Sequence, residues 1–160
     1  MHRAMLQFTL VVAVGLVLTA CGDGGASQAP SAQDGFIAGS DMGAAVDAAQ
    51  SSTDLPPGAS FDPIDLETEG SYEEGYAEII VDGSAQCEWF LYWLEVFDSA
   101  DPEAQEMALE GLAALHDSTL FRTADVSFTD LVEGIEEQAA LGDPTGIRDF
   151  VTLNCRGVTR

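Results

Sequence analysis

An apolar repeat between residues 76 and 97 constrains the fold more than any other feature of this chain. Its members recur at spacings of three and four residues, which places them on one face of a helix. Ser71 and Glu74 have the spacing of a capping box, whose side chains satisfy the first free backbone N–H groups of a helix. The sequence therefore predicts one helix over about 71–98. The apolar face consists of Tyr76, Ile79, Ile80, Gly83, Cys87, Phe90, Leu91, Leu94 and Phe97.

The first part of this helix leaves a second interpretation open. Valine and isoleucine favour strands, so residues 76–81 could form a strand, followed by a helix that begins at Ser84. The capping box and the unbroken apolar spacing favour the helix.

The second half of the predicted helix is expected to be enclosed by other helices. Trp89, Trp93 and Val96 extend its apolar face to an arc of roughly 220°, which leaves Glu88 and Glu95 outside. A helix with so wide an apolar face is expected to be central. The two tryptophans are expected to be core residues, because aromatic rings contribute most to buried cores. The alternative is that they line a ligand groove.

Three further helices are expected after the central one. Asp101-Pro102 and Asp143-Pro144 each pair an N-cap residue with the proline favoured at the first helical position. They predict one helix over about 102–116 and another from 144 to 155. A further helix is expected to begin near 127 and to end before Gly142. The fold class is therefore all-α, a small four-helix domain over 71–160. His116, at a helix end, is expected to interact with the helix dipole, with a catalytic role as the alternative.

The first 20 residues have the three-part pattern of a secretory signal. An apolar run from Phe8 to Leu18 is too short for a membrane span, which needs about 20 residues. The junction Leu18-Thr19-Ala20-Cys21 resembles the lipobox of bacterial lipoproteins. That resemblance implies cleavage before Cys21, acylation of its thiol and an extracytoplasmic protein held on the cell membrane by lipid. The alternative is an ordinary signal peptide with an unrelated cysteine at its end, and no named family resembles residues 71–160.

The cysteine count predicts one disulfide. Of the three cysteines, Cys21 is assigned to the lipid, which leaves Cys87 and Cys155. An even pair in an oxidising compartment is typical of a disulfide, and closing this loop would stabilise the fold by about 4 kcal/mol in the chain-entropy model. The alternative is a metal site of both cysteines, His116 and a carboxylate, but no short Cys or His spacing supports it.

Residues 21–70 are expected to form a lipidated, disordered and acidic linker. Large apolar side chains are sparse there, so the segment would not bury enough surface to offset its chain entropy. A helix over 42–50 would be too short to be stable alone. The carboxylates at the end of the linker could bind Ca²⁺ weakly, although no calcium-loop motif is present. They are Asp62, Asp65, Glu67 and Glu69.

The negative charge of the chain limits the classes of function that it can have. Aspartate and glutamate number 28, lysine and arginine together 5, and all five are arginines. A surface of this sign repels phosphate backbones, so nucleic acid is not expected as a partner. Because the chain has no lysine, it can contain neither the phosphate-binding lysine of a P-loop nor a lysine that forms a Schiff base. No catalytic residue, metal or cofactor is expected.

The function expected from these features is a non-catalytic binding module, displayed from the membrane, for another envelope protein or a small ligand. Two alternatives stay open. One is a hydrolase that uses paired carboxylates, with Glu73, Glu74, Glu78 and Glu88 as candidates. The other is an acidic surface protein that binds cations such as Ca²⁺.

Overall fold

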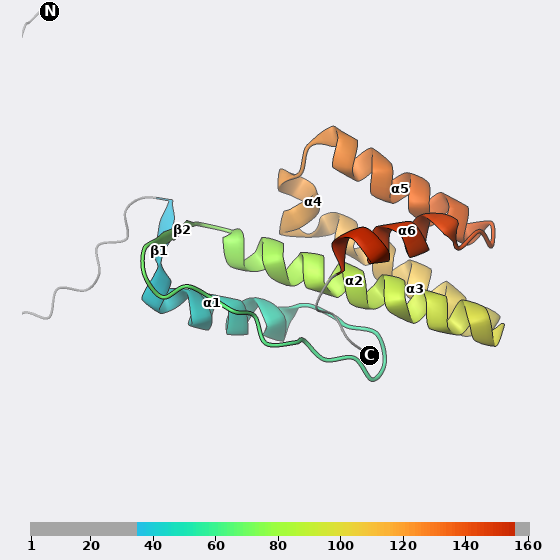
Figure 1. Cartoon of the computed structure of the whole chain (residues 1–160), viewed down its shortest axis with the longest axis horizontal. Coiled ribbons are helices and arrows are strands. Elements are labelled where there is room, and N and C mark those ends of the chain that lie inside the picture. The colour runs from blue at the N-terminus through green and yellow to red at the C-terminus, as the bar shows by residue number, and fades with distance from the viewer. Residues whose placement is uncertain (1–34, 156–160) are drawn as a thin grey trace, which may run out of the picture.

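Helix α2, Tyr76–Ser99, is the element around which the others are arranged (Figure 1). The structure is a computed structural model and describes residues 35–155. The predicted all-α class is confirmed, with one small sheet of two strands. In chain order the elements are β1 (Phe36–Ala38), α1 (Gly39–Ser52), β2 (Ser71–Glu73), α2, α3 (Pro102–Ala114), the 3-10 helix η1 (Leu115–Asp117), α4 (Thr119–Thr123), α5 (Val126–Ala140) and α6 (Thr145–Asn154).

The start of α2 differs from the prediction. Residues 71–73 form β2, which pairs antiparallel with β1 so that Ile37 lies opposite Tyr72. The predicted capping box therefore does not form, because pairing with a strand from an earlier part of the chain overrides the local motif. Gly75 is the N-cap instead, with φ of 87°, a conformation that glycine adopts at little cost. Residues 76–81 are helical, so the strand alternative is wrong.

The helices after α2 begin and end close to the predicted positions. Asp101 caps α3 by accepting a hydrogen bond from the Ala104 N–H at 3.1 Å. Asp143 accepts from the Thr145 N–H at 3.0 Å, just before α6. Helix α5 begins one residue earlier than expected, capped by Asp125, and hydrogen bonds from Ser127 are the main reason that the pKa of this carboxyl is lowered. Helix α4 lies between two of the predicted helices and was not itself predicted.

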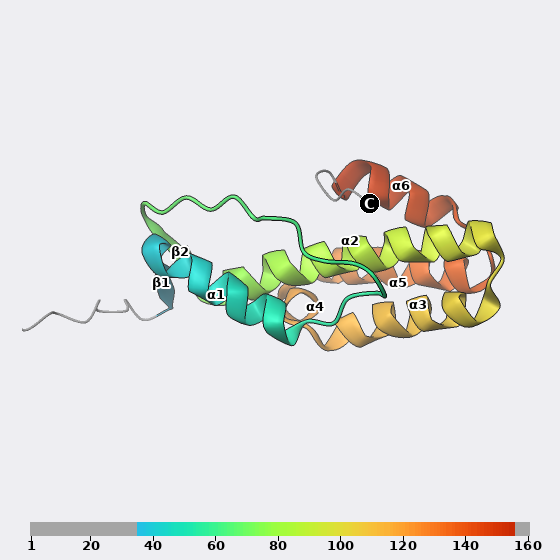
Figure 2. The same cartoon turned by 90° about the horizontal axis from the view of Figure 1, so that it is seen from below.

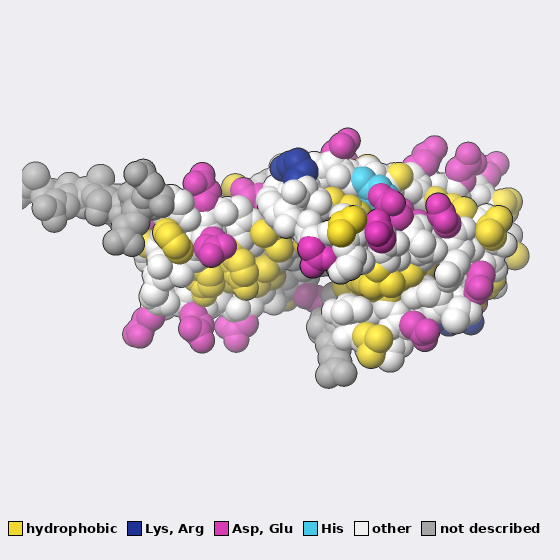
Figure 3. Space-filling view, turned by 90° about the horizontal axis from the view of Figure 1, so that it is seen from above, with side chains coloured by type: hydrophobic (Ala, Val, Ile, Leu, Met, Phe, Trp, Pro, Cys, Tyr) yellow, Lys and Arg dark blue, Asp and Glu magenta, His cyan; other side chains and the backbone are white. Residues whose placement is uncertain are grey.

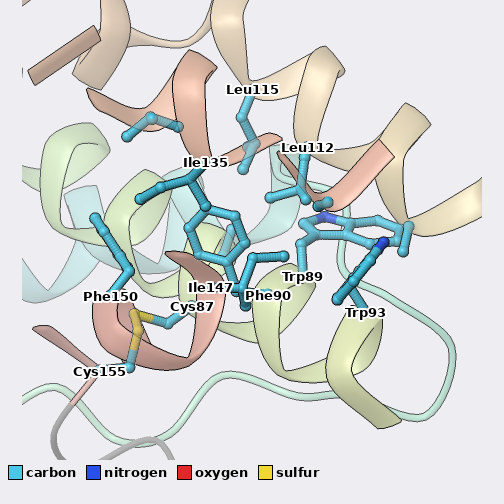
Figure 4. Close-up of a cluster of buried hydrophobic side chains, with 14 of the residues drawn as sticks. Cys87, Trp89, Phe90, Trp93, Leu112, Leu115, Ile135, Ile147, Phe150 and Cys155 are labelled. Atoms are coloured by element: carbon cyan, nitrogen blue, oxygen red, sulfur yellow. A yellow bond between two sulfur atoms is a disulfide. The ribbon is translucent and has the colours of Figure 1, made fainter. Parts of the chain in front are cut away.

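The larger core lies between α2 and the helices that follow it (Figure 4). Phe90 of α2 is fully buried and meets Phe150 of α6 edge to face, with ring centroids 5.1 Å apart. Cys87 and Cys155 form the predicted disulfide, with Cα atoms 5.5 Å apart, an ordinary separation for such a bond. This link fastens the end of α6 to the middle of α2.

A second, smaller core lies on α2 near its N-terminal end. Met42, Val46 and Ala49 of α1 are buried against Ala77 and Val81 of α2. The prediction of a disordered linker is therefore wrong for residues 36–70, while residues 21–34 lie outside the described part of the chain. The physical reason is that α2 supplies the apolar surface that an isolated helix of this length lacks.

The segment between α1 and β2 runs beside the helices and turns back toward β2 (Figure 2). Its apolar side chains pack against both cores. Leu55 and Phe61 pack against the larger core, and Ile64 and Leu66 against the smaller one. The few large apolar residues of this segment are thus used for docking. Glu88 was predicted to lie outside the apolar arc but is only 5% exposed, because residues 57–62 lie beside that part of α2.

Among residues 35–155, no helix combines the length and the apolar character that crossing a membrane requires.

Candidate binding groove

A groove of about 740 Å³ opens where α1, α2 and the α3–α4 region meet. One wall is formed within residues 49–57, at the end of α1 and in the chain that follows it. Residues from 78 to 89 of α2 contribute a second wall, and residues from 107 to 122 form the third. This volume lies in the range of small-molecule sites, about 300–1,000 Å³. We call this feature the binding groove.

Trp89 forms part of the groove wall but shows little of its surface there. Its side chain is 7% exposed, and its indole N–H donates to the Asp54 backbone oxygen at 3.2 Å. Gly111 of α3 covers the ring, because a Cβ added at this glycine would lie 2.6 Å from three of the indole carbons. The glycine therefore allows α3 to approach α2 closely. Trp89 joins all three walls of the groove: α2 by its backbone, α3 by contact and residue 54 by the hydrogen bond.

Trp93, the other tryptophan considered as a ligand-facing residue, lies away from the groove. It is completely buried and stacks on Phe97 with ring centroids 4.9 Å apart. Figure 4 shows both tryptophans against the Leu112 side of the core. The Trp93 indole N–H has no hydrogen-bond partner among the residues that the structure describes.

The groove combines an apolar lining with acidic groups. Leu55, Met107 and Leu115 supply apolar surface, and Met107 is 44% exposed. Asp82 of α2 also lines the groove and is buried, and its Oδ2 accepts a hydrogen bond from the Leu120 N–H at 3.0 Å. That bond fixes the start of α4 to α2.

His116 lies close to this region but makes a different contact. Its Nε2 is 3.0 Å from Glu136 Oε2, and its ring stacks on Phe121 with centroids 4.5 Å apart. Burial raises the pKa of Glu136, and the charge of His116 acts in the opposite direction. His116 therefore connects η1 to α5, a tertiary contact that the expectation of a helix-end residue did not include.

The remaining candidate residues are dispersed. Glu73 and Glu74 are exposed beside β2, Glu78 lines the groove and Glu88 is buried near residues 57–62. Within residues 35–155, no three His, Cys, Asp or Glu side chains come close enough to hold a metal ion. Cys87 and Cys155 are joined to each other. The acylation site predicted at Cys21 lies outside the described residues.

Sequence reasoning missed the wall formed within residues 49–57. The signal that indicates it is the spacing of Met42, Val46 and Ala49, which marks one face of a helix. Gly111 lies in the middle of α3, where no local pattern marks it as a contact residue. Its role in admitting Trp89 depends on a contact between two helices, which the sequence alone does not specify.

Comparisons with protein-family models, with curated proteins and with solved structures found no match to this chain.

Replacing Gly111 with alanine tests the contact with Trp89. Alanine favours helices over glycine by about 1 kcal/mol, but here its Cβ would meet the indole ring, and overpacking costs about 1–3 kcal/mol. Gly134→Ala in α5 is the matched control, because a Cβ there would meet nothing within 4 Å. We expect Gly111→Ala to have a free energy of unfolding about 1–3 kcal/mol below that of Gly134→Ala, measured by urea denaturation. Equal stabilisation by both substitutions would contradict the contact.

Proposed function

We propose that this protein is an extracytoplasmic lipoprotein whose helical body is a non-catalytic binding module for a small ligand. In this proposal the chain is cut before Cys21, and acyl groups on Cys21 hold it on the cell membrane. Two or more acyl chains anchor a protein firmly where one does not. The Leu18–Cys21 motif supports the anchor, and the Cys87–Cys155 disulfide is typical of an oxidising compartment outside the cytoplasm.

The observation that favours binding is the groove itself. It is concave, its size suits a small molecule, and it combines apolar side chains with a few polar groups. Ligand sites have this composition, since apolar surface supplies affinity and placed polar groups supply orientation. Its walls come from three distant parts of the sequence, so the site exists only in the folded chain.

The two alternative functions have less support. A hydrolase with two carboxylates needs both on opposite sides of the bond to be cleaved. Of the four candidate glutamates, only Glu78 lines the groove. Calcium binding by the acidic surface needs several oxygen ligands around one ion, and no three His, Cys, Asp or Glu side chains of residues 35–155 are grouped so that they could hold one.

The anchor is tested by the chemical state of residue 21. We expect the wild-type protein to begin at Cys21, to carry a diacylglyceryl group there and to incorporate labelled palmitate. Cys21→Ser should incorporate none, because serine lacks the thiol that is acylated. Intact-mass spectrometry and radiolabelling measure both. The variant with Cys87→Ser and Cys155→Ser is the control and should keep the label. A wild-type protein without lipid, or one cut at another position, would contradict the anchor.

The groove is tested by fragment screening with nuclear magnetic resonance. The chain has two tryptophans, so its indole N–H signals separate the groove, at Trp89, from the core, at Trp93. We expect at least one fragment to shift the Trp89 signal in a saturable manner and to leave the Trp93 signal unchanged.

Two alanines of α3 provide a matched pair of variants for this screen. Ala114 lines the groove, whereas its neighbour Ala113 is exposed but does not. Ala114→Trp should fill the groove and abolish fragment binding, while Ala113→Trp should leave it intact. A screen without any binder, or binding that survives Ala114→Trp, would contradict the proposal. The added tryptophan contributes a third indole signal, which is assigned by comparison with the parent spectrum.

A further inference from the structure

The charge around the binding groove is strongly one-sided. Acidic side chains are scattered over the visible face of the protein, with few basic ones among them (Figure 3). The groove lining is also mostly acidic, and its carboxylates lie around one concave space. Its ionisable lining consists of Asp54, Glu78, Asp82, Glu110, Asp117 and a single cation, Arg122.

Arg122 can offset only one of these five negative charges, and it pairs directly with none of the carboxylates. Its guanidinium donates to the Asp117 backbone oxygen and, at 2.9 Å, to the Thr119 hydroxyl. Within residues 35–155 it forms no ion pair with a carboxylate; the two ion pairs there are His116–Glu136 and Arg148–Asp98. The guanidinium is thus engaged by neutral oxygens, and the acidic groups of the lining keep their charge unbalanced.

Four of the five carboxylates occupy two walls that face the same space. Glu78 and Asp82 are one helical turn apart on α2, so they lie on the same face of that helix. Glu110 and Asp117 belong to α3 and η1, in another wall. Asp82 is 7% exposed, and a charge removed from water interacts more strongly with an opposite charge than one at the surface. A cationic group in the groove would be attracted from both walls.

The same lining indicates what kind of cation fits. A bare metal ion needs several ligands at one point, and no such group is present in the described part of the chain. Leu55, Met107 and Leu115 instead offer apolar surface beside the carboxylates. Methionine adapts readily to the shape of a bound apolar group. An occupant with both an apolar body and a positive charge would use both parts of the lining.

We infer that the binding groove takes a small organic cation, an amine or guanidinium compound with an apolar body. This inference rests on the proposal that the groove is a ligand site. Part of the attraction between the cation and the groove is electrostatic, so added salt weakens binding. The acidic walls repel an anion of the same shape.

Three probes of one shape test the inference: 3-phenylpropylammonium, 3-phenylpropanol and 3-phenylpropanoate. Each is titrated into residues 21–160, produced with Cys21→Ser, and the indole N–H signals are followed. We expect the ammonium probe to shift Trp89 and to bind about tenfold or more tightly than the alcohol, with the carboxylate weakest. The affinity of the ammonium probe should fall as ionic strength rises, whereas that of the alcohol should not.

Variants that remove charge from the wall of residues 107–122 distinguish binding in the groove from binding to the general acidic surface. Glu110→Gln with Asp117→Asn should weaken the ammonium probe about threefold to tenfold and leave the alcohol unchanged. Both residues are exposed, so the fold should not depend on them. Glu103→Gln with Glu106→Gln is the matched control, since both glutamates are exposed, lie on α3 and do not line the groove.

The outcomes separate this inference from the proposed function. If the alcohol or the carboxylate binds as tightly as the ammonium probe, or if the charge-removing variant binds the ammonium probe normally, the inference is overturned and the groove remains a ligand site. If all three probes fail while other fragments bind, the same conclusion holds. If no fragment of any kind binds, both the inference and the proposed function fail.

Discussion

The burial of α2 on more than one side is the constraint on which the rest of this structure depends. Its N-terminal part buries Ala77 and Val81 against α1, and its middle buries Phe90 and Trp93 against the later helices. Even polar residues of α2 are enclosed, among them Gln86, which is 2% exposed. A helix buried in this way cannot be stable alone, because each apolar face needs a partner. The two ends of the described chain are therefore ordered by the same helix.

The groove is a consequence of how these partners meet on α2. Helix α3 comes close because Gly111 leaves room for the Trp89 ring. The chain after α1 is held near the same ring by the hydrogen bond from the Trp89 indole to the Asp54 backbone oxygen. The space left between these contacts is lined by both apolar and acidic groups. A single tryptophan thus contacts all three walls, although little of its own surface is exposed.

Much of the C-terminal half could be predicted from the sequence, because its signals are local. The Asp-Pro pairs at 101 and 143 mark helix starts, and two cysteines remaining after Cys21 indicate one disulfide. The N-terminal half was predicted poorly because its elements are held in place by contacts with residues far away in the sequence. Residues 36–70 contain few large apolar side chains, and composition alone suggests a linker. Those few side chains suffice because α2 and α3 present apolar surface to receive them.

The difference between local signals and tertiary contacts also explains how much of the candidate site could be predicted. Both tryptophans were expected to be core residues, with a ligand groove as the alternative. Both are buried, but Trp89 also borders the groove, whereas Trp93, which has the same local signal, does not. Helical spacing does not separate the two, since the difference depends on where α1 and residues 53–57 dock. The capping box at 71–74 failed for a related reason, because strand β1 pairs with those residues. Local motifs were reliable only where no distant segment competes.

The central claim is that residues 36–70 are part of the folded body, since without them the groove lacks the wall formed within residues 49–57. Hydrogen exchange of backbone amides in residues 21–160, with lipidation prevented by Cys21→Ser, tests this most directly. We predict that amides on the buried face of α1, at Val46 and Ala49, exchange slowly and are protected to an extent similar to those of residues 80–85 in α2. Exchange of these α1 amides at the rate of an unstructured chain, with α2 still protected, would contradict the claim and remove the proposed site.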